Sequence, residues 1–362
     1  MIAVIGGVKT RVRIKMAPPE RDIEKQRKQD EEALLAAGID INNMGNEDSR
    51  QGSPAEADPL DARFEAYYRQ KMQEQANENY WDQVGLGAKD FGGYAPIDAE
   101  EDTDIQVSCS GCAYNVARIL APKTETAFVS VVGNDALGLA ARCELSEAGV
   151  DISAVKTLEG TTPVGVEIVN ILGDLDFARD NMKLAREITP ELIDEAEGII
   201  NGAEAIFADG SIPVETLNYI SEKYGDKCPI YFDPASIQGG YAFAESSLKA
   251  ECVMPGRMEA EAMSSQQVLG LDQLMSAGEA FENRGTSKTI ITLKGGGLYY
   301  KEGPQSGIIK PEQQFPSTTA TRGAGDVLSA QLILELINGT DFKTAAESAV
   351  AAAVDFIKEV NL

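Results

Sequence analysis

Apolar and polar residues alternate along most of this chain in two regular patterns. Short apolar runs rich in Val and Ile are typical of buried strands, whereas an apolar residue about every 3.6 positions is typical of an amphipathic helix. The predicted strands are residues 2–5, 127–132, 164–170, 205–208, 230–232, 252–254 and 289–293. The predicted helices include residues 136–147, 190–200, 214–223 and 271–282. This alternation predicts an α/β fold with a mostly parallel sheet and helices on both faces.

The turn at residues 320–326, ATRGAGD, is the strongest chemical signal. It precedes an apolar run, residues 327–337, which predicts a buried helix. Glycines at the start of a helix leave backbone N–H groups free, and these groups together with the helix dipole favour an anion. Asp326 follows in the first turn, where a carboxylate is placed to accept a hydroxyl proton during phosphoryl transfer. The alternative is an ordinary tight turn in which Asp326 only stabilises the helix.

A strongly acidic segment, residues 17–105, follows the first predicted strand. It holds 22 acidic and 9 basic residues, so its net charge of −13 is half of the −26 carried by the whole chain. Residues 20–37 and 58–84 predict helices, and the second begins with Asp58-Pro59. One face of that second helix carries Leu60, Phe64, Tyr67, Tyr68 and Met72. This face either packs on the protein's own core or forms a docking surface for a partner.

Composition excludes several classes of function. The chain has 58 Asp and Glu residues against 32 Lys and Arg residues, which argues against a basic nucleic-acid-binding face and against adhesion to an anionic membrane. No apolar stretch approaches membrane-spanning length. The sequence contains no His, which excludes histidine-based triads, metal sites and proton shuttles. Any chemistry therefore uses carboxylates, Lys, Ser, Thr, Cys or backbone dipoles.

The five cysteines are thinly spread, and we expect reduced thiols in a protein of the cytoplasm or of an organellar matrix. Cys109 and Cys112 form a C-x-x-C pair. Because the chain has neither a second such pair nor a His, we do not expect a zinc or redox site there. We expect two small residues packed at the start of a helix.

Five motifs, in order along the chain, resemble those of the ribokinase-like (PfkB) family of sugar and nucleoside kinases. They are SGCAYNVA at 110–117, VGNDALG at 132–138, PGRME at 255–259, TLKGGG at 292–297 and TRGAGD at 321–326. The resemblance covers residues 107–362 and the strand at 2–5, about three-quarters of the chain. Shorter pieces resemble the pseudouridine kinase branch of the family: DNM at 180–182, ADG at 208–210, FDPAS at 232–236 and EAEA at 259–262.

The resemblance implies a ribokinase-like three-layer sandwich. Residues 1–16 and 106–362 would form the kinase domain, and residues 17–105 would be an acidic, partly helical insertion that replaces the usual lid. The implied reaction transfers the γ-phosphate of ATP, with Mg²⁺, to the primary hydroxyl of a nucleoside or similar sugar.

The resemblance also implies roles for particular residues. The implied catalytic groups are Asp326 as the base and, as the anion hole for the γ-phosphate, Gly323, Ala324 and Gly325. The implied substrate contacts are Asn115 and Gly111. The residues implied to border ATP are Thr292, Gly295, Gly297 and Thr321. Glu259 would help to hold Mg²⁺ and its waters, since that ion keeps much of its hydration shell.

Five positions depart from the family motifs and affect both implied substrate pockets: Arg11, Ser110, Gly256, Lys294 and Ala320. Arg11 stands where the family has an Asp that grips sugar hydroxyls, and a cation cannot accept their hydrogens. Ser110 places a side chain where the backbone meets the sugar. Gly256 removes a polar contact near phosphate and metal, and Lys294 either obstructs the nucleotide or reaches a phosphate.

These departures leave two main hypotheses. In the first, the protein is a working kinase with an altered substrate preference and a rebuilt lid. In the second, it has lost turnover and serves as a scaffold or assembly subunit, with residues 17–105 contacting a protein partner or a second copy of the chain. A nucleotide-sensing regulator without catalysis and a C-x-x-C redox protein rank lower.

Overall fold

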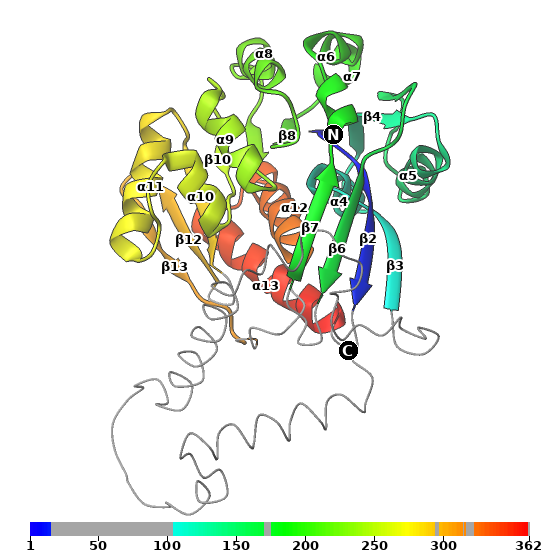
Figure 1. Ribbon diagram of the computed structural model, residues 1–362. Helices are drawn as coiled ribbons and strands as arrows, with labels where there is room; N and C mark the ends of the chain where they lie inside the picture. The colour runs from blue at the N-terminus through cyan, green and yellow to red at the C-terminus, as the bar shows by residue number, and fades with distance from the viewer. Residues whose placement is uncertain (16–103, 170–174, 294–296, 314, 316–321, 361–362) are drawn as a thin grey trace, which may run out of the picture. The chain divides into compact units, whose positions relative to one another are not determined.

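The structure, a computed structural model, describes residues 1–15, 104–169, 175–293, 297–313, 315 and 322–360. Within them, the main sheet has nine strands in the order β13-β12-β11-β10-β9-β8-β1-β4-β5 (Figure 1). These are β1 (Ile2–Ile5), β4 (Thr126–Gly133), β5 (Val155–Leu158), β8 (Ala205–Asp209), β9 (Ile230–Asp233), β10 (Cys252–Val253), β11 (Lys288–Leu293), β12 (Gly297–Glu302) and β13 (Gln305–Ile309). Neighbouring strands pair in parallel except in the two hairpins β11-β12 and β12-β13. The predicted mostly parallel sheet is confirmed.

Helices cover both faces of this sheet, and the central strand β1 shows why its residues are all apolar. Ile2 and Val4 belong to one hydrophobic cluster, and Ala3 and Ile5 belong to the other. The first cluster includes residues of α4 (Cys112–Leu120), α5 (Ala136–Glu147), α12 (Ala324–Ile337) and α13 (Phe342–Val360). The second includes residues of α6 (Pro190–Glu195), α7 (Glu197–Ile200), α8 (Val214–Tyr224), α9 (Ile237–Glu245), α10 (Arg257–Ser264) and α11 (Leu271–Asn283). The predicted helices at 136–147, 214–223 and 271–282 are confirmed, and the one at 190–200 is divided between α6 and α7.

A second, smaller sheet lies beside the main one and was not predicted. Its order is β3-β2-β6-β7, from β2 (Lys9–Lys15), β3 (Asp104–Ser110), β6 (Val164–Val169) and β7 (Leu175–Asn181). Residues 164–169 therefore do not belong to the main sheet, where the sequence pattern placed them. The sequence analysis expected the insertion to replace the lid that follows the first strand. In the structure the first strand is followed by β2, which belongs to this small sheet. β2 and β3 pair antiparallel with Lys15 opposite Asp104, so residues 16–103 connect two adjacent strand ends.

The chain divides into two compact units, Met1–Lys15 with Asp104–Leu362, and Met16–Thr103. The second unit, which contains the predicted helices at 20–37 and 58–84, lies outside the described residues. Asp104 and Ile105, placed in the insertion by the sequence pattern, are part of β3. Among the helices that the structure describes, none is long and apolar enough to cross a membrane.

The two faces of the small sheet differ because successive side chains of a strand point to opposite sides. Val12 pairs with Val107 on one side and with Val166 on the other, so apolar residues share one face. Arg11 and Arg13 alternate with Val12 and share the opposite face, where Arg13 is paired with Glu167 of β6. Glu167 contacts Arg322, which precedes α12, so this charged face is turned toward the start of that helix.

Candidate functional site

Asp326 lies in the first turn of α12, which begins at Ala324 rather than at residue 327. Gly323 is the N-cap residue and has a φ of 92°, a left-handed conformation that favours glycine. A Cβ atom at Gly323 would lie 3.0 Å from the Phe356 ring. The first N–H groups of a helix have no partner within it. The backbone of Gly323, Ala324 and Gly325 therefore offers amide donors next to the Asp326 carboxylate.

Asn115, on α4, holds the Asp326 carboxylate directly. Its Nδ2 atom donates a hydrogen bond of 2.7 Å to Asp326 Oδ2, and the Cys112 thiol also hydrogen bonds to this carboxylate. Gly111 is the N-cap residue of α4 and has a φ of 134°; a Cβ atom there would lie 2.6 Å from the carbonyl oxygen of Gly7, after β1. The fold thus brings together three residues that the sequence analysis singled out in two distant motifs: Gly111, Asn115 and Asp326.

Burial raises the pKa of Asp326 to about 6, and the nearby Asp209 adds to the rise. The hydrogen bonds from Asn115 and Cys112 and the positive charge of Arg11 act in the opposite direction. A carboxylate with a pKa near 6 is largely ionised at pH 7 and is a stronger base than an exposed Asp. Asp326 is therefore suited to accept a proton at neutral pH.

The Asn115→Ala variant is expected to move the acid limb of the pH–activity profile to higher pH. The lost hydrogen bond stabilises the charged carboxylate, so the pKa of Asp326 rises further without it. The measurement is kcat/KM between about pH 5 and pH 8, with the exposed Asn201→Ala as a matched control whose profile stays that of the wild type. An acid limb that stays in place or moves to lower pH would contradict this prediction.

Two further carboxylates, missed by the sequence analysis, end the neighbouring strands β8 and β9. Asp209 is 2% exposed and accepts hydrogen bonds of 3.0 Å from the backbone N–H groups of Ala113 and Ser211. Asp233 accepts a hydrogen bond of 3.1 Å from the hydroxyl of Ser329, a residue that lies one turn after Asp326 in α12. Burial raises the pKa of both, that of Asp233 to about 7. These residues tie the strand ends to α4 and α12, and the signal for them was an Asp directly after each of two apolar runs.

Of the cysteine pair, Cys112 begins α4 as expected, whereas Cys109 lies in β3 and not at the start of a helix. Cys109 and Cys112 are both free. Burial raises the pKa of both thiols, that of Cys109 to about 11, so they stay protonated near neutral pH. Across the described part of the chain, no group of three or more Cys, Asp and Glu residues is arranged to hold a metal ion.

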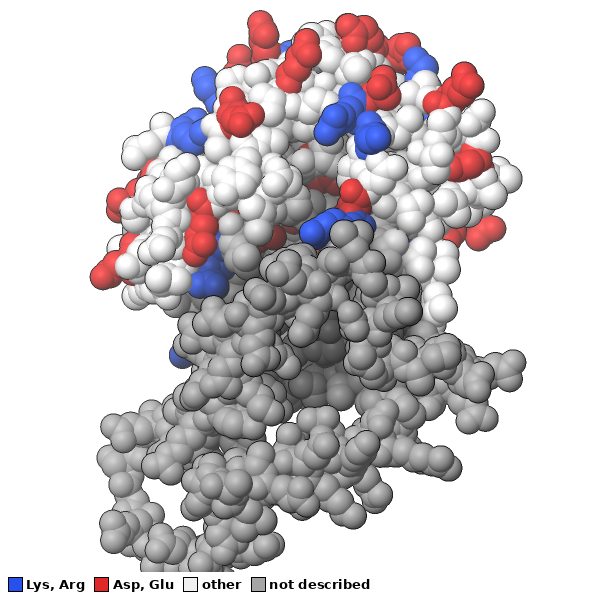
Figure 2. Space-filling view, viewed as in Figure 1, with Lys and Arg blue, Asp and Glu red and all other residues white. Residues whose placement is uncertain are grey.

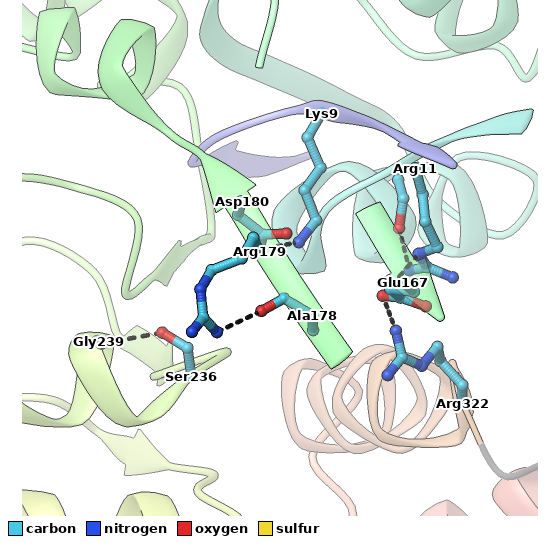
Figure 3. Close-up of polar contacts among 10 residues, drawn as sticks. Lys9, Arg11, Glu167, Ala178, Arg179, Asp180, Ser236, Gly239 and Arg322 are labelled. Carbon is cyan, nitrogen blue, oxygen red and sulfur yellow. Dashed lines mark hydrogen bonds and ion pairs between the residues drawn. The ribbon is translucent and has the colours of Figure 1, made fainter. Parts of the chain in front are cut away.

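Two of the departures from the family motifs are partners of each other. The Arg11 guanidinium donates a hydrogen bond to the Ser110 hydroxyl, and Ser110 is buried. Arg11 Nε also lies 3.5 Å from Glu167 Oε1, and Arg322 forms an ion pair with the same oxygen (Figure 3). The Ser110 side chain therefore fixes the arginine, whereas the sequence analysis expected it only to intrude on a sugar.

Lys9 and Arg179 extend this charged group toward α9. Lys9 is paired with Asp180, and Arg179 points toward Ser236, the N-cap of α9 (Figure 3). On the same side of the molecule, Lys and Arg side chains border a hollow, with Asp and Glu side chains beside and within it as well as over the rest of the surface (Figure 2).

The residues expected to border ATP and Mg²⁺ lie on α10, β11 and β12. An isolated bridge pairs Gly256 with Thr292, and a Cβ atom at Gly256 would lie 2.5 Å from Glu259 Oε2. The missing side chain at Gly256 thus leaves room that the Glu259 carboxylate fills. Gly297 has a φ of 84°, and a Cβ atom there would overlap the Ile309 carbonyl. The other four positions lie outside the described residues: Gly295, Lys294, Ala320 and Thr321.

Comparison with known proteins agrees with this geometry. The profile described as pfkB family carbohydrate kinase matches residues 84–360. The pseudouridine kinase of Escherichia coli (strain K12) is 24% identical over 241 residues, which are 66% of this chain and 76% of that protein. A putative sugar kinase from Clostridium perfringens has a similar fold, with a TM-score of 0.64, 19% identity, and coverage of 99% of this chain and 89% of that one. The structure of Arabidopsis thaliana ribokinase, solved with ribose and ATP, also has a TM-score of 0.64. It is 14% identical in sequence, and the match covers 97% of this chain and 90% of the ribokinase. The chain therefore belongs to the pfkB family of carbohydrate kinases.

Proposed function

We propose that this protein transfers the γ-phosphate of ATP to the primary hydroxyl of a nucleoside or sugar; one of its relatives is named a pseudouridine kinase. The observation that carries the proposal is the Asp326 carboxylate, which has a pKa near 6, is held by Asn115, and lies in the first turn of α12 beside free backbone amides. A base and an anion-stabilising group so close together are what transfer of a phosphoryl group to a hydroxyl requires.

In this reaction the acceptor oxygen forms a new bond to the γ-phosphorus while the bond from that phosphorus to the bridging oxygen breaks. ADP leaves with the electron pair of the broken bond, and the hydroxyl proton passes to Asp326, which later releases it to solvent. The amides of Gly323, Ala324 and Gly325 stabilise the negative charge on the moving phosphoryl group. Asn115 keeps the Asp326 carboxylate oriented toward the hydroxyl.

The described residues fit Mg²⁺ in the way this ion is commonly bound, by one or two carboxylates, substrate phosphates and several waters. Glu259 is the carboxylate that would hold it, and its position beside Thr292 is fixed by the bridge at Gly256. When bound, Mg²⁺ would supply positive charge to the phosphates of ATP.

The test is turnover by the purified full chain with Mg-ATP and a panel of sugars and nucleosides that includes pseudouridine. We expect ADP and a phosphorylated acceptor, identified by mass spectrometry, and a nucleotide-dependent rise in melting temperature. Absence of product with every acceptor, together with no effect of ATP on the melting temperature, would refute the proposal. The described residues give no support to the scaffold hypothesis, whose segment, residues 17–105, lies almost entirely outside them.

A further inference from the structure

Three arginines gather around one buried carboxylate beside Asp326. Arg11 and Arg13 come from β2, Arg322 directly precedes the N-cap of α12, and Glu167 comes from β6. The Glu167 side chain is only 5% exposed and pairs with Arg11 and Arg322 (Figure 3). We call these four residues the arginine cluster. It lies next to the proposed base, since the charge of Asp326 acts on both Arg11 and Arg322.

The charges of the arginine cluster do not balance. Three guanidinium groups carry +3 and Glu167 carries −1, so the arginine cluster itself has a surplus of +2 in a chain whose net charge is −26. The ionised Asp326, whose charge acts on Arg11 and Arg322, offsets one of these charges until it takes a proton. Arg13 Nε is buried and has no hydrogen-bond partner among the described residues. Burial, together with the positive charges of Arg11 and Arg13, lowers the pKa of Arg322 to about 10. The side chains of Arg11 and Arg322 are partly open to solvent, 21% and 37% exposed, so an anion from solution can reach these guanidinium groups and stabilise them.

We propose that the acceptor carries a phosphate ester, and that the arginine cluster binds this phosphate while Asp326 takes the proton from a hydroxyl elsewhere on the same molecule. A phosphate monoester has a charge of about −1.5 to −2 at neutral pH, which matches the surplus. The planar fork of a guanidinium forms paired hydrogen bonds to phosphate oxygens. A neutral sugar would leave the surplus uncompensated, and a carboxylate would cancel half of it. The inference rests on the proposed function and narrows its substrate class.

The site geometry also explains why an arginine replaces the expected Asp without removing the base. Arg11 lowers the pKa of Asp326, so it keeps that carboxylate ionised. An Asp at position 11 would instead repel a phosphate ester and raise the pKa of Asp326. The departure at Arg11 is therefore consistent with a change of acceptor rather than with a loss of catalysis.

The first test compares acceptors that differ only in a phosphate: ribose against ribose 1-phosphate, and uridine against uridine 3′-monophosphate. We expect kcat/KM at least about tenfold higher for each ester than for its neutral parent, as one charge-assisted hydrogen bond contributes that much. Gluconate, a sugar acid with a free primary hydroxyl, tests a carboxylate in place of the phosphate, and its kcat/KM should fall between that of glucose and that of glucose 1-phosphate. Equal or lower kcat/KM for the esters would overturn the inference.

The second test uses Arg13→Gln, which leaves Glu167 paired with Arg11 and Arg322. We expect it to lower the preference for the ester about tenfold, while Arg13→Lys keeps part of the preference because it keeps the charge. Lys343→Gln, which removes one exposed positive charge from α13, is the matched control and should keep the wild-type preference. If Arg13→Gln instead raises the KM for ATP equally with esters and neutral parents, the cluster serves the nucleotide and the inference fails.

Binding without ATP separates this inference from the proposed function. Isothermal titration with uridine 3′-monophosphate and with uridine needs no turnover, and the comparison of these two ligands on the wild-type protein needs no variant. Tighter binding of the ester, weakened by Arg13→Gln and by added salt, would support the phosphate site even if no acceptor is ever phosphorylated. Turnover of neutral acceptors without any preference for the ester would support the proposed function and overturn the inference.

Discussion

The Asp326→Asn variant is expected to lower kcat at least about 100-fold, the usual effect of removing a general base. The amide keeps the size and the contact with Asn115 but cannot take the hydroxyl proton. The measurement is steady-state kinetics with Mg-ATP and the best acceptor. Calorimetric titration should show ATP affinity within about threefold of the wild type, because the anion-binding amides are backbone groups.

The same variant should be more stable than the wild type at high pH. The pKa of Asp326 in the folded protein is above its ordinary value, so ionisation of this carboxyl disfavours folding. This cost is fully present well above pH 6 and disappears as the pH falls through about 6 toward the ordinary pKa of Asp. The gain in melting temperature should therefore be larger at pH 8 than at pH 5. Asp355→Asn, on the exposed side of α13, is the matched control for loss of one carboxylate.

A gain in stability with a loss of turnover cannot come from misfolding. If Asp326→Asn keeps wild-type kcat, Asp326 is not the base and the proposed mechanism is wrong. If the variant is inactive but destabilised at every pH, the buried carboxylate contributes to folding through its hydrogen bonds, and the argument from burial is wrong.

The Gly111→Ala variant is expected to have the largest effect on stability, lowering the free energy of unfolding by about 3 kcal/mol or more. Two costs add: a φ of 134°, which L residues rarely adopt, and a Cβ atom 2.6 Å from the Gly7 carbonyl oxygen. Relief requires α4 to move away from β1, which also shifts Asn115 relative to Asp326. Chemical denaturation measures the first effect, and kcat of the remaining folded protein measures the second.

Gly149→Ala is the matched control for Gly111→Ala. Gly149 also has a positive φ, of 85°, but a Cβ atom there would meet nothing within 4 Å. This substitution carries only the backbone cost, about 1 kcal/mol, and should leave kcat unchanged. Equal losses of stability in the two variants would show that the close approach of α4 to Gly7 does not matter.

The main sheet could be predicted because its strands are buried on both faces. In β1 every residue is apolar, so the run is unbroken, and helices with an apolar face follow several of the other main-sheet strands, such as β4, β8 and β9. The small sheet was missed for the opposite reason. β2 reads KTRVRIK, and alternating charges and apolar residues in so short a run did not stand out as a strand. Its partner β3 lies beyond residues 16–103, a separation that no local pattern can bridge.

The candidate site was predicted in part. Asp326 and its glycines carry a local signal, since a Gly-rich turn and a helix start are adjacent in sequence. The contact between Asn115 and Asp326 joins segments more than two hundred positions apart, so only the fold reveals it. The arginine cluster was not predicted, because Arg11, Glu167 and Arg322 come from three distant segments. Each charged residue alone gives no signal in the sequence. The register of β2 and β6 brings the two β2 arginines next to Glu167, and only the fold adds Arg322.

The pairing of Lys15 with Asp104 has a consequence for how this chain tolerates its long acidic segment. Ladder partners in an antiparallel pair have Cα atoms about 5 Å apart, so the strands need only a short turn between them. A longer connection adds little to the entropy of closing that loop, about 0.6 kcal/mol for each doubling of its length. The β2-β3 hairpin is therefore a point at which the kinase domain accommodates a long connecting segment at a small cost in loop-closure entropy.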